Sequence, residues 1–232
     1  MENKSKFDFD NKGYVFLKNV CTIDSIEKIN QDIRDFMNNN NIYLHLKKRH
    51  DVSEELYFVN NTYTSLNSYN KMQYYYLPVI DNRGSHNRTN DVGMIDIYNV
   101  DKLIPSLYNN IDINLILTII NKISDTKWKL LRTNIQICSN VSNPTSFHFE
   151  NTDKCIKFAI YLSDIINDDY GPPVFIEKTH IIKNNFKNDD IKKFNGNKGD
   201  VLISYQNGIH RKLPQKNTTV GFLVLNFIPY FS

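Results

Sequence analysis

The sequence lacks the features that mark secreted and membrane-spanning proteins. It has only three cysteines in 232 residues and no C-x-x-C pair, which indicates reduced thiols rather than a disulfide framework. The longest apolar stretch, over 113–123, is interrupted by Asn114, Thr118, Asn121 and Lys122 and is too short to span a bilayer. The N-terminus has no apolar segment of the kind found in signal peptides. We therefore expect a soluble, cytoplasmic protein that does not enter a membrane.

No sign of charge dominates the chain. The 28 Lys and Arg residues are interleaved with 25 Asp and Glu residues, and the net charge is only +3, so no nucleic-acid partner is expected. Glycine is scarce, with eight residues, and we find no linker and no internal repeat that would divide the chain. A hydrophobic fraction of 41% is typical of globular proteins. These properties predict a single domain over 1–232.

The first half of the chain reads mainly as helices. A short β-type run over 13–18 precedes apolar residues at helical spacing, which predict an amphipathic helix over about 24–37. A second helix is expected near 53–70 and a third over 111–123. The polar, turn-rich segment 82–91 is expected to form a long surface loop that could act as a lid.

The second half changes to extended segments separated by Asn, Asp, Gly and Pro. The predicted strands are 128–138, 155–162, 173–176, 200–205 and 220–228. Helices followed by short strands favour a mainly β (α+β) fold, in which an antiparallel core carries N-terminal helices packed on one face.

One short motif carries most of the chemical information. His148 and Glu150 stand two residues apart, so on an extended segment their side chains point to the same side. His210, from another strand, could complete a face of two histidines and one carboxylate. Such a set holds Fe(II) on three sides and leaves other positions open for O₂ and an organic acid.

The order of segments around this motif resembles a known family. His148-Phe-Glu150 is followed by Lys157-Phe-Ala-Ile-Tyr-Leu-Ser-Asp164 and by Tyr170-Gly-Pro-Pro-Val-Phe-Ile-Glu-Lys-Thr-His180. Lys198-Gly-Asp-Val-Leu-Ile-Ser204 and Gly208-Ile-His-Arg-Lys-Leu-Pro214 come next. This arrangement resembles the phytanoyl-CoA dioxygenase-like family of Fe(II)/2-oxoglutarate-dependent oxygenases. The resemblance covers most of the chain and is strongest over 145–228.

The resemblance implies a fold and a set of ligands. The fold would be a double-stranded β-helix, that is, a cupin-like jelly roll, formed by 126–232, with 1–125 as helical elaboration and opening strands. His148, Glu150 and His210 would bind Fe(II) and form the catalytic centre, with 2-oxoglutarate and O₂ as cosubstrates. His180, at the end of the Gly-Pro-Pro segment, is expected to have a structural role.

Two positions refine what the resemblance implies. Halogenating relatives have a small residue in place of the carboxylate, so Glu150 favours hydroxylation or a related oxidation. The family's arginine for the far carboxylate of 2-oxoglutarate, about ten residues after the distal histidine, is missing from Thr218-Thr-Val-Gly221. The available substitutes are Arg211, Lys212, Lys157 and Arg132. We favour Lys157 or Arg132, the latter with Asn134 on the same side of its strand.

Three functions remain open from the sequence. The first is a 2-oxoglutarate-dependent oxygenase that hydroxylates or otherwise oxidises a small-molecule or carrier-linked substrate. The second is a jelly-roll binding protein without catalysis, and the third is a mononuclear iron oxygenase that does not use 2-oxoglutarate. A monomer or dimer is the default expectation for the assembly.

Overall fold

The structure is a computed structural model of the chain. Its described parts are residues 2–40, 56–59, 62–65, 78–82, 93–141, 143–150, 155–183, 186–216 and 218–230. The predicted surface loop over 82–91 lies outside these parts, except for Asn82. Within the described parts, no helix combines the length and the apolar character needed to cross a membrane.

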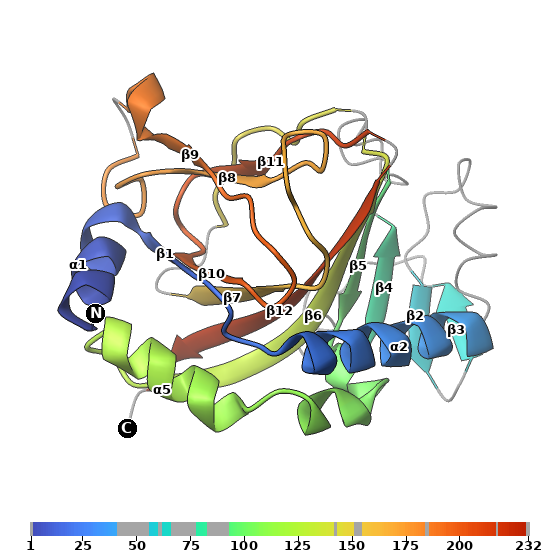
Figure 1. The fold of residues 1–232 in the computed structure, drawn as a ribbon. Helices are drawn as coiled ribbons and strands as arrows, with labels where there is room; N and C mark the ends of the chain where they lie inside the picture. Colours follow the sequence, from blue (N-terminus) through green and yellow to red (C-terminus); the bar gives the residue numbers. More distant parts are fainter. Residues whose placement is uncertain are drawn as a thin grey trace.

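A large antiparallel sheet forms the centre of the molecule (Figure 1). Its nine strands run in the order β1-β10-β7-β12-β6-β5-β4-β2-β3. Their bounds are β1 Tyr14–Leu17, β2 Leu56–Val59, β3 Thr62–Ser65, β4 Val79–Asn82, β5 Met94–Tyr98, β6 Trp128–Ser139, β7 Ile156–Tyr161, β10 Val201–Tyr205 and β12 Thr219–Pro229. The long strands β6 and β12 pair along their whole length, with one irregularity next to Asn226.

A small sheet lies across one face of the large one (Figure 1). It has the order β11-β8-β9, with β8 at Pro173–Ile176, β9 at Ile191–Lys193 and β11 at His210–Lys212. A single β-bridge between His148 and His210 adds the segment around the metal motif to its free edge. The space between the two sheets is where the candidate site lies.

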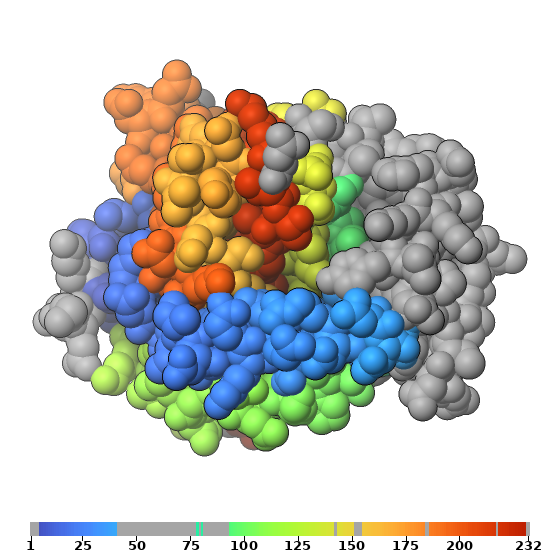
Figure 2. All heavy atoms as spheres, turned by 45° about the vertical axis from the view of Figure 1, so that its right-hand side comes forward, coloured from blue at the N-terminus to red at the C-terminus, as the bar shows by residue number. Residues whose placement is uncertain are grey.

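Helices cover the other face of the large sheet. They are α1 (Glu2–Lys12), α2 (Ile23–Asn39) and α5 (Ile113–Ile123), with the 3₁₀ turns η3 (Val100–Lys102) and η4 (Pro105–Asn109). A further 3₁₀ turn, η5 (Asn188–Asp190), lies next to β9 of the small sheet (Figure 1). In Figure 2, α2 lies across the lower part of the molecule as a blue ridge, directly above the green segment that contains η4 and α5. The predicted packing of helices against one face of an antiparallel sheet is confirmed.

Strand alternation divides the apolar residues between two cores. Along β7, Ile156, Phe158 and Ile160 face the helices, whereas Ala159 and Tyr161 face the small sheet. The outer core is completed by α2 and α5, and the inner core by aromatic residues such as Phe175 of β8. The inner core does not fill the whole space between the sheets, and polar side chains such as Gln206 and Thr145 occupy part of it.

The predicted elements agree with the structure except in two places. The strands predicted in the second half are present as β6, β7, β8, β10 and β12, with ends that differ by at most one residue. The helix predicted near 53–70 is wrong where the chain is described, because 56–59 and 62–65 form the antiparallel pair β2–β3. Helix α1 was not predicted at all.

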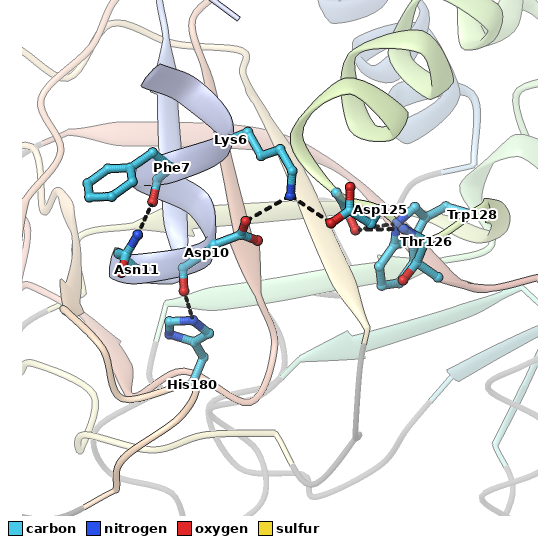
Figure 3. A network of polar contacts seen from close by, with 9 residues as sticks. Lys6, Phe7, Asp10, Asn11, Asp125, Thr126, Trp128 and His180 are labelled. Carbon is cyan, nitrogen blue, oxygen red and sulfur yellow. Dashed lines mark hydrogen bonds and ion pairs between the residues drawn. The ribbon is translucent and has the colours of Figure 1, made fainter. Parts of the chain in front are cut away.

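Helix α1 is fixed to the rest of the molecule by polar contacts from its middle and its C-terminal end. Figure 3 shows Lys6 between Asp10 and Asp125, at 2.9 and 2.8 Å, so that α1 is joined to the chain two residues after the end of α5. On the other side, the His180 ring lies below the carbonyl of Asp10. These contacts explain how a mostly polar segment remains helical in this position.

Candidate active site

A cavity of about 100 Å³ lies between the two sheets and contains all three predicted metal ligands. His148, Glu150 and His210 line it together with residues of β7, β8, β10, β11 and β12. Its wall carries three basic side chains, Lys157, Arg211 and Lys212. The sequence therefore identified three side chains that the fold brings to one place, although 62 residues separate the two histidines.

The two histidines are held next to each other by the backbone. His148 N donates to His210 O at 3.0 Å, and His210 N donates to His148 O at 2.9 Å. The centroids of the two rings are 4.6 Å apart. Phe175, opposite His210 on β8, stacks parallel to the His210 ring. The histidine pair is thus a feature of the sheet edge and does not depend on side-chain contacts alone.

The hydrogen bonds of the two rings fix which nitrogen of each ring is left for a metal. Nδ1 of His148 lies 2.7 Å from the carbonyl oxygen of Ser146, and Nδ1 of His210 lies 2.9 Å from that of Gly208. A carbonyl can only accept, so each Nδ1 carries a proton and Nε2 is the ring nitrogen available to a metal ion. Burial, followed by the charges of Lys157 and His148, lowers the pKa of His210 well below its usual value, which keeps this ring neutral. The two rings, each with Nε2 turned away from its backbone partner, are the kind of donor that a ferrous ion requires.

Glu150 lies in the same cavity but is turned toward a cation. The Glu150 backbone N–H donates to the Gln206 carbonyl at 3.0 Å, which fixes this segment beside the end of β10. The Lys157 ammonium donates to Glu150 Oε1 at 2.8 Å. Phe149, between the two ligands, is 45% exposed and points outward, as the alternation predicted.

The donor set fits an iron ion, with one adjustment. Among the described residues, no three His, Cys, Asp or Glu side chains stand together in a geometry ready to coordinate a metal. The Glu150 carboxylate is instead paired with the Lys157 ammonium. Glu150 would have to exchange its contact with Lys157 for one with the metal before the three side chains could hold a single ion.

The residues predicted to bind the cosubstrate occupy different surroundings. Arg132 and Asn134 lie on the inner side of β6, and neither lines the cavity. The Arg132 guanidinium lies over the Tyr98 ring at 5.3 Å, and Asn134 accepts a hydrogen bond from the Asn99 backbone at 3.3 Å. Lys157 does line the cavity. The cofactor-binding roles of these three residues stay predictions.

Lys212 has the most enclosed position of the basic residues in the cavity wall. Lys212 is only 7% exposed, and its ammonium lies 5.1 Å from the centroid of the Phe222 ring. The Lys212 backbone N–H donates to the Thr145 hydroxyl at 2.9 Å, and the Thr145 backbone N–H donates to the Lys212 carbonyl at 3.1 Å. Lys212, Thr145 and Phe222 therefore form one end of the cavity.

Sequence reasoning missed several polar residues of this site. Gln206 and Thr145 line the cavity and are 4% and 6% exposed, and Gln206 donates from its side chain to Asn226. Asn226 stands opposite Lys157 and Arg132 on β12. The signal was available, since Asn226 is the one strongly polar residue in the predicted strand 220–228, where apolar residues dominate.

Comparison with known proteins gives a fold but no sequence relative. No protein-family model matches the chain, and no curated protein sequence matches it significantly. Among solved structures, the epimerase SnoN from nogalamycin biosynthesis, a non-heme α-ketoglutarate-dependent enzyme, aligns with a TM-score of 0.65 and 9% identity, covering 98% of this chain and 82% of its own.

Two proteins from Streptomyces align equally well. HygX from Streptomyces hygroscopicus, solved with nickel and 2-oxoglutarate bound, gives a TM-score of 0.67 and 10% identity over 98% of this chain and 87% of its own. AviO1 from Streptomyces viridochromogenes Tue57 gives a TM-score of 0.66 and 9% identity, covering 98% of this chain and 95% of its own. At such identities the likeness establishes a common fold. This chain thus has the fold found in 2-oxoglutarate-dependent non-heme enzymes.

Proposed function

We propose that this protein is an Fe(II)- and 2-oxoglutarate-dependent oxygenase that hydroxylates or otherwise oxidises a small molecule. The observation that carries the proposal is the histidine pair, because two adjacent rings bind backbone carbonyls through Nδ1 and leave their Nε2 atoms for a metal in a cavity that also contains Glu150. The common fold with SnoN and HygX supports it. The two sheets would then be the halves of the double-stranded β-helix that the sequence resemblance implies.

Each part of the site would have a distinct task. His148, Glu150 and His210 would hold the ferrous ion, which together with bound 2-oxoglutarate and O₂ supplies the oxidation of a substrate C–H bond. The occupied carboxylate position leaves no ligand site for chloride, so hydroxylation or a related oxidation is favoured over halogenation. The apolar cavity wall, which includes Val174, Leu202 and Val224, would exclude water.

The substrate would be a small molecule, free or linked to a carrier. SnoN has been solved with nogalamycin RO and HygX with hygromycin B, and both are small-molecule ligands. In this chain, the polar residues next to the cavity, Gln206 and Asn226, would suit a substrate with hydrogen-bonding groups.

One experiment separates the three functions that the sequence left open. The protein is loaded with Fe(II) without oxygen, 2-oxoglutarate is added, and the visible spectrum is recorded. We expect a weak charge-transfer band, followed by succinate once oxygen is admitted. Iron binding without a band or succinate would favour an oxygenase that does not use 2-oxoglutarate. A protein that binds no iron would be a non-catalytic binding module.

A further inference from the structure

We infer that Lys212 selects the cosubstrate, by pairing with the carboxylate that lies farthest from the metal. This inference rests on the proposed function and extends it to a residue that the sequence did not favour. It makes Lys212 a specificity-determining residue: the cavity accepts a 2-oxo acid at the metal ligands and distinguishes such acids by whether they carry a second acid group.

The position of Lys212 follows from strand geometry. His210 and Lys212 are two residues apart on β11, so both side chains enter the cavity from the same side. Lys212 extends along β11 away from the metal ligands, toward Thr145 and Phe222. A ligand that chelates a metal at His210 and continues along the cavity in this direction brings its far end to the Lys212 ammonium.

The surroundings of Lys212 give its charge a strong effect. The residue is 7% exposed and its ammonium lies over the face of the Phe222 ring, so bulk water screens it little. A carboxylate placed there gains a charge-assisted hydrogen bond in a low-dielectric setting. The Thr145 hydroxyl, which accepts from the Lys212 backbone, still has a proton to donate to the same carboxylate.

The other basic residues are less suited to this role. Lys157 donates to Glu150, a predicted metal ligand, and so lies at the metal itself rather than at the far end of the cavity. Arg211 also lines the cavity, but alternation along β11 turns it away from His210, and its guanidinium lies 4.1 Å from the centroid of the Phe147 ring. Arg132 stacks over Tyr98 outside the cavity wall. Lys212 is therefore the cation that a second carboxylate would meet first.

The test compares two ligands that differ only at the far end. 2-Oxoglutarate and 2-oxopentanoate both chelate Fe(II) through a 2-oxo acid, but 2-oxopentanoate has a methyl group where 2-oxoglutarate has its second carboxylate. The dissociation constant of each is measured without oxygen, from the charge-transfer band of the Fe(II) protein. We expect the wild type to bind 2-oxoglutarate about 10- to 100-fold more tightly, the range of one hydrogen bond to a charged group.

The variants locate the group responsible. Lys212→Met should lower this ratio to about one by weakening 2-oxoglutarate alone, with 2-oxopentanoate changed by no more than about twofold. Lys212→Arg should retain much of the ratio, because a guanidinium also pairs with a carboxylate. Arg211→Met and Arg132→Met are the matched controls, each removing one nearby cation, and should keep the wild-type ratio.

The possible outcomes separate this inference from the proposed function. If the Fe(II) protein gives no band with either ligand, the proposed function fails. If both ligands bind the wild type equally, chelation stands and the selection by Lys212 is refuted without any variant. The inference is also refuted if Lys212→Met keeps the wild-type ratio of the two dissociation constants. It is likewise refuted if that ratio is lost in Lys157→Met or Arg132→Met instead. Should Lys212→Met fail to fold, Lys212→Gln keeps the length and a polar end and answers the same question.

Discussion

His180 shows how a single side chain fixes an element that the sequence did not predict. Its Nε2 donates to the Asp10 carbonyl at 3.0 Å (Figure 3). Its ring stacks on Tyr205 with centroids 5.2 Å apart. Nδ1 is buried next to Gly13, and it has no hydrogen-bond partner among the described residues. A methyl group on Gly13 would come within 2.4 Å of this atom. The structural role predicted for His180 is thus confirmed.

This environment makes the stability of the protein depend on pH. Burial lowers the pKa of His180 in the folded state, whereas the unfolded chain has a pKa of about 6.5. Between these two values the unfolded state binds more protons, so the free energy of unfolding falls as pH decreases below about 6.5. Protonation would place an N–H at the buried Nδ1, where no acceptor is available among the described residues.

The measurement is urea denaturation of the metal-free wild type and of His180→Gln at about pH 7.5 and at about pH 5.5, on either side of the histidine pKa. We expect the wild type to lose more stability than the variant on acidification. Other titrating groups cancel in the difference, because both proteins contain them. Parallel pH profiles would show that His180 tolerates its proton in the folded state.

Helix α2 is the element whose start and buried face are both specified locally. Thr22 is the N-cap, with extended backbone, and its hydroxyl accepts from the Ser25 backbone at 3.2 Å. Ile26, Ile29, Ile33 and Met37 are then buried along one side of the helix. The cap satisfies a backbone donor that the helix leaves unpaired, and the apolar side is covered by the large sheet.

Removing the cap should therefore destabilise the protein by a predictable amount. We expect Thr22→Ala to lower the free energy of unfolding by about 1 kcal/mol. Thr118→Ala is the matched control, because Thr118 is an exposed residue within α5 whose hydroxyl donates to the Asn114 carbonyl at 2.8 Å. Alanine is the better helix former there, so this variant should be as stable as the wild type or slightly more so. Equal losses in both variants would contradict the capping role.

The elements that could be predicted from the sequence are those whose burial gives a regular pattern of apolar residues along the chain. Strands β7 and β12 are buried on both sides, so they read as continuous apolar runs, and α2 shows a regular helical period. Helix α1 lacks such a pattern because it is stabilised by Phe9 and by distant partners such as Asp125 and His180. The β2–β3 pair depends on contacts with β4, which no local period reveals.

The site was predictable to the extent that alternation determines it. His148 and Glu150 were expected on one side of an extended segment, and both line the cavity. Alternation could not decide which basic residue binds the cosubstrate, because it places Lys157, Arg132 and Lys212 all on the inward-facing side of their strands. Only the fold shows that Lys212 is enclosed against Phe222, that Lys157 reaches Glu150 and that Arg132 stacks outside the cavity.

At the scale of the whole molecule, the site joins segments that are far apart in the sequence and belong to different sheets. His148 lies on a segment added to the small sheet by one bridge, and His210 belongs to β11 of that sheet. Glu150 is fixed by the carbonyl of Gln206, which follows β10 of the large sheet. A metal ion bound by all three side chains would connect both sheets across the cavity between them.

Metal and cosubstrate should therefore stabilise the entire fold. A ligand that binds only the folded state, at 100 times its dissociation constant, adds about 2.7 kcal/mol. For a chain of this size, that corresponds to a rise of about 5–10 °C in melting temperature. We expect this rise with Mn(II), an oxygen-stable substitute for Fe(II), and a further rise with 2-oxoglutarate, both reversed by a chelator.

His148→Ala is the decisive comparison: because the His148 side chain is exposed, the metal-free variant should melt close to the wild type. A variant that still gains the full increase would show that the metal binds elsewhere, whereas loss of the increase alone locates the metal at the junction of the two sheets.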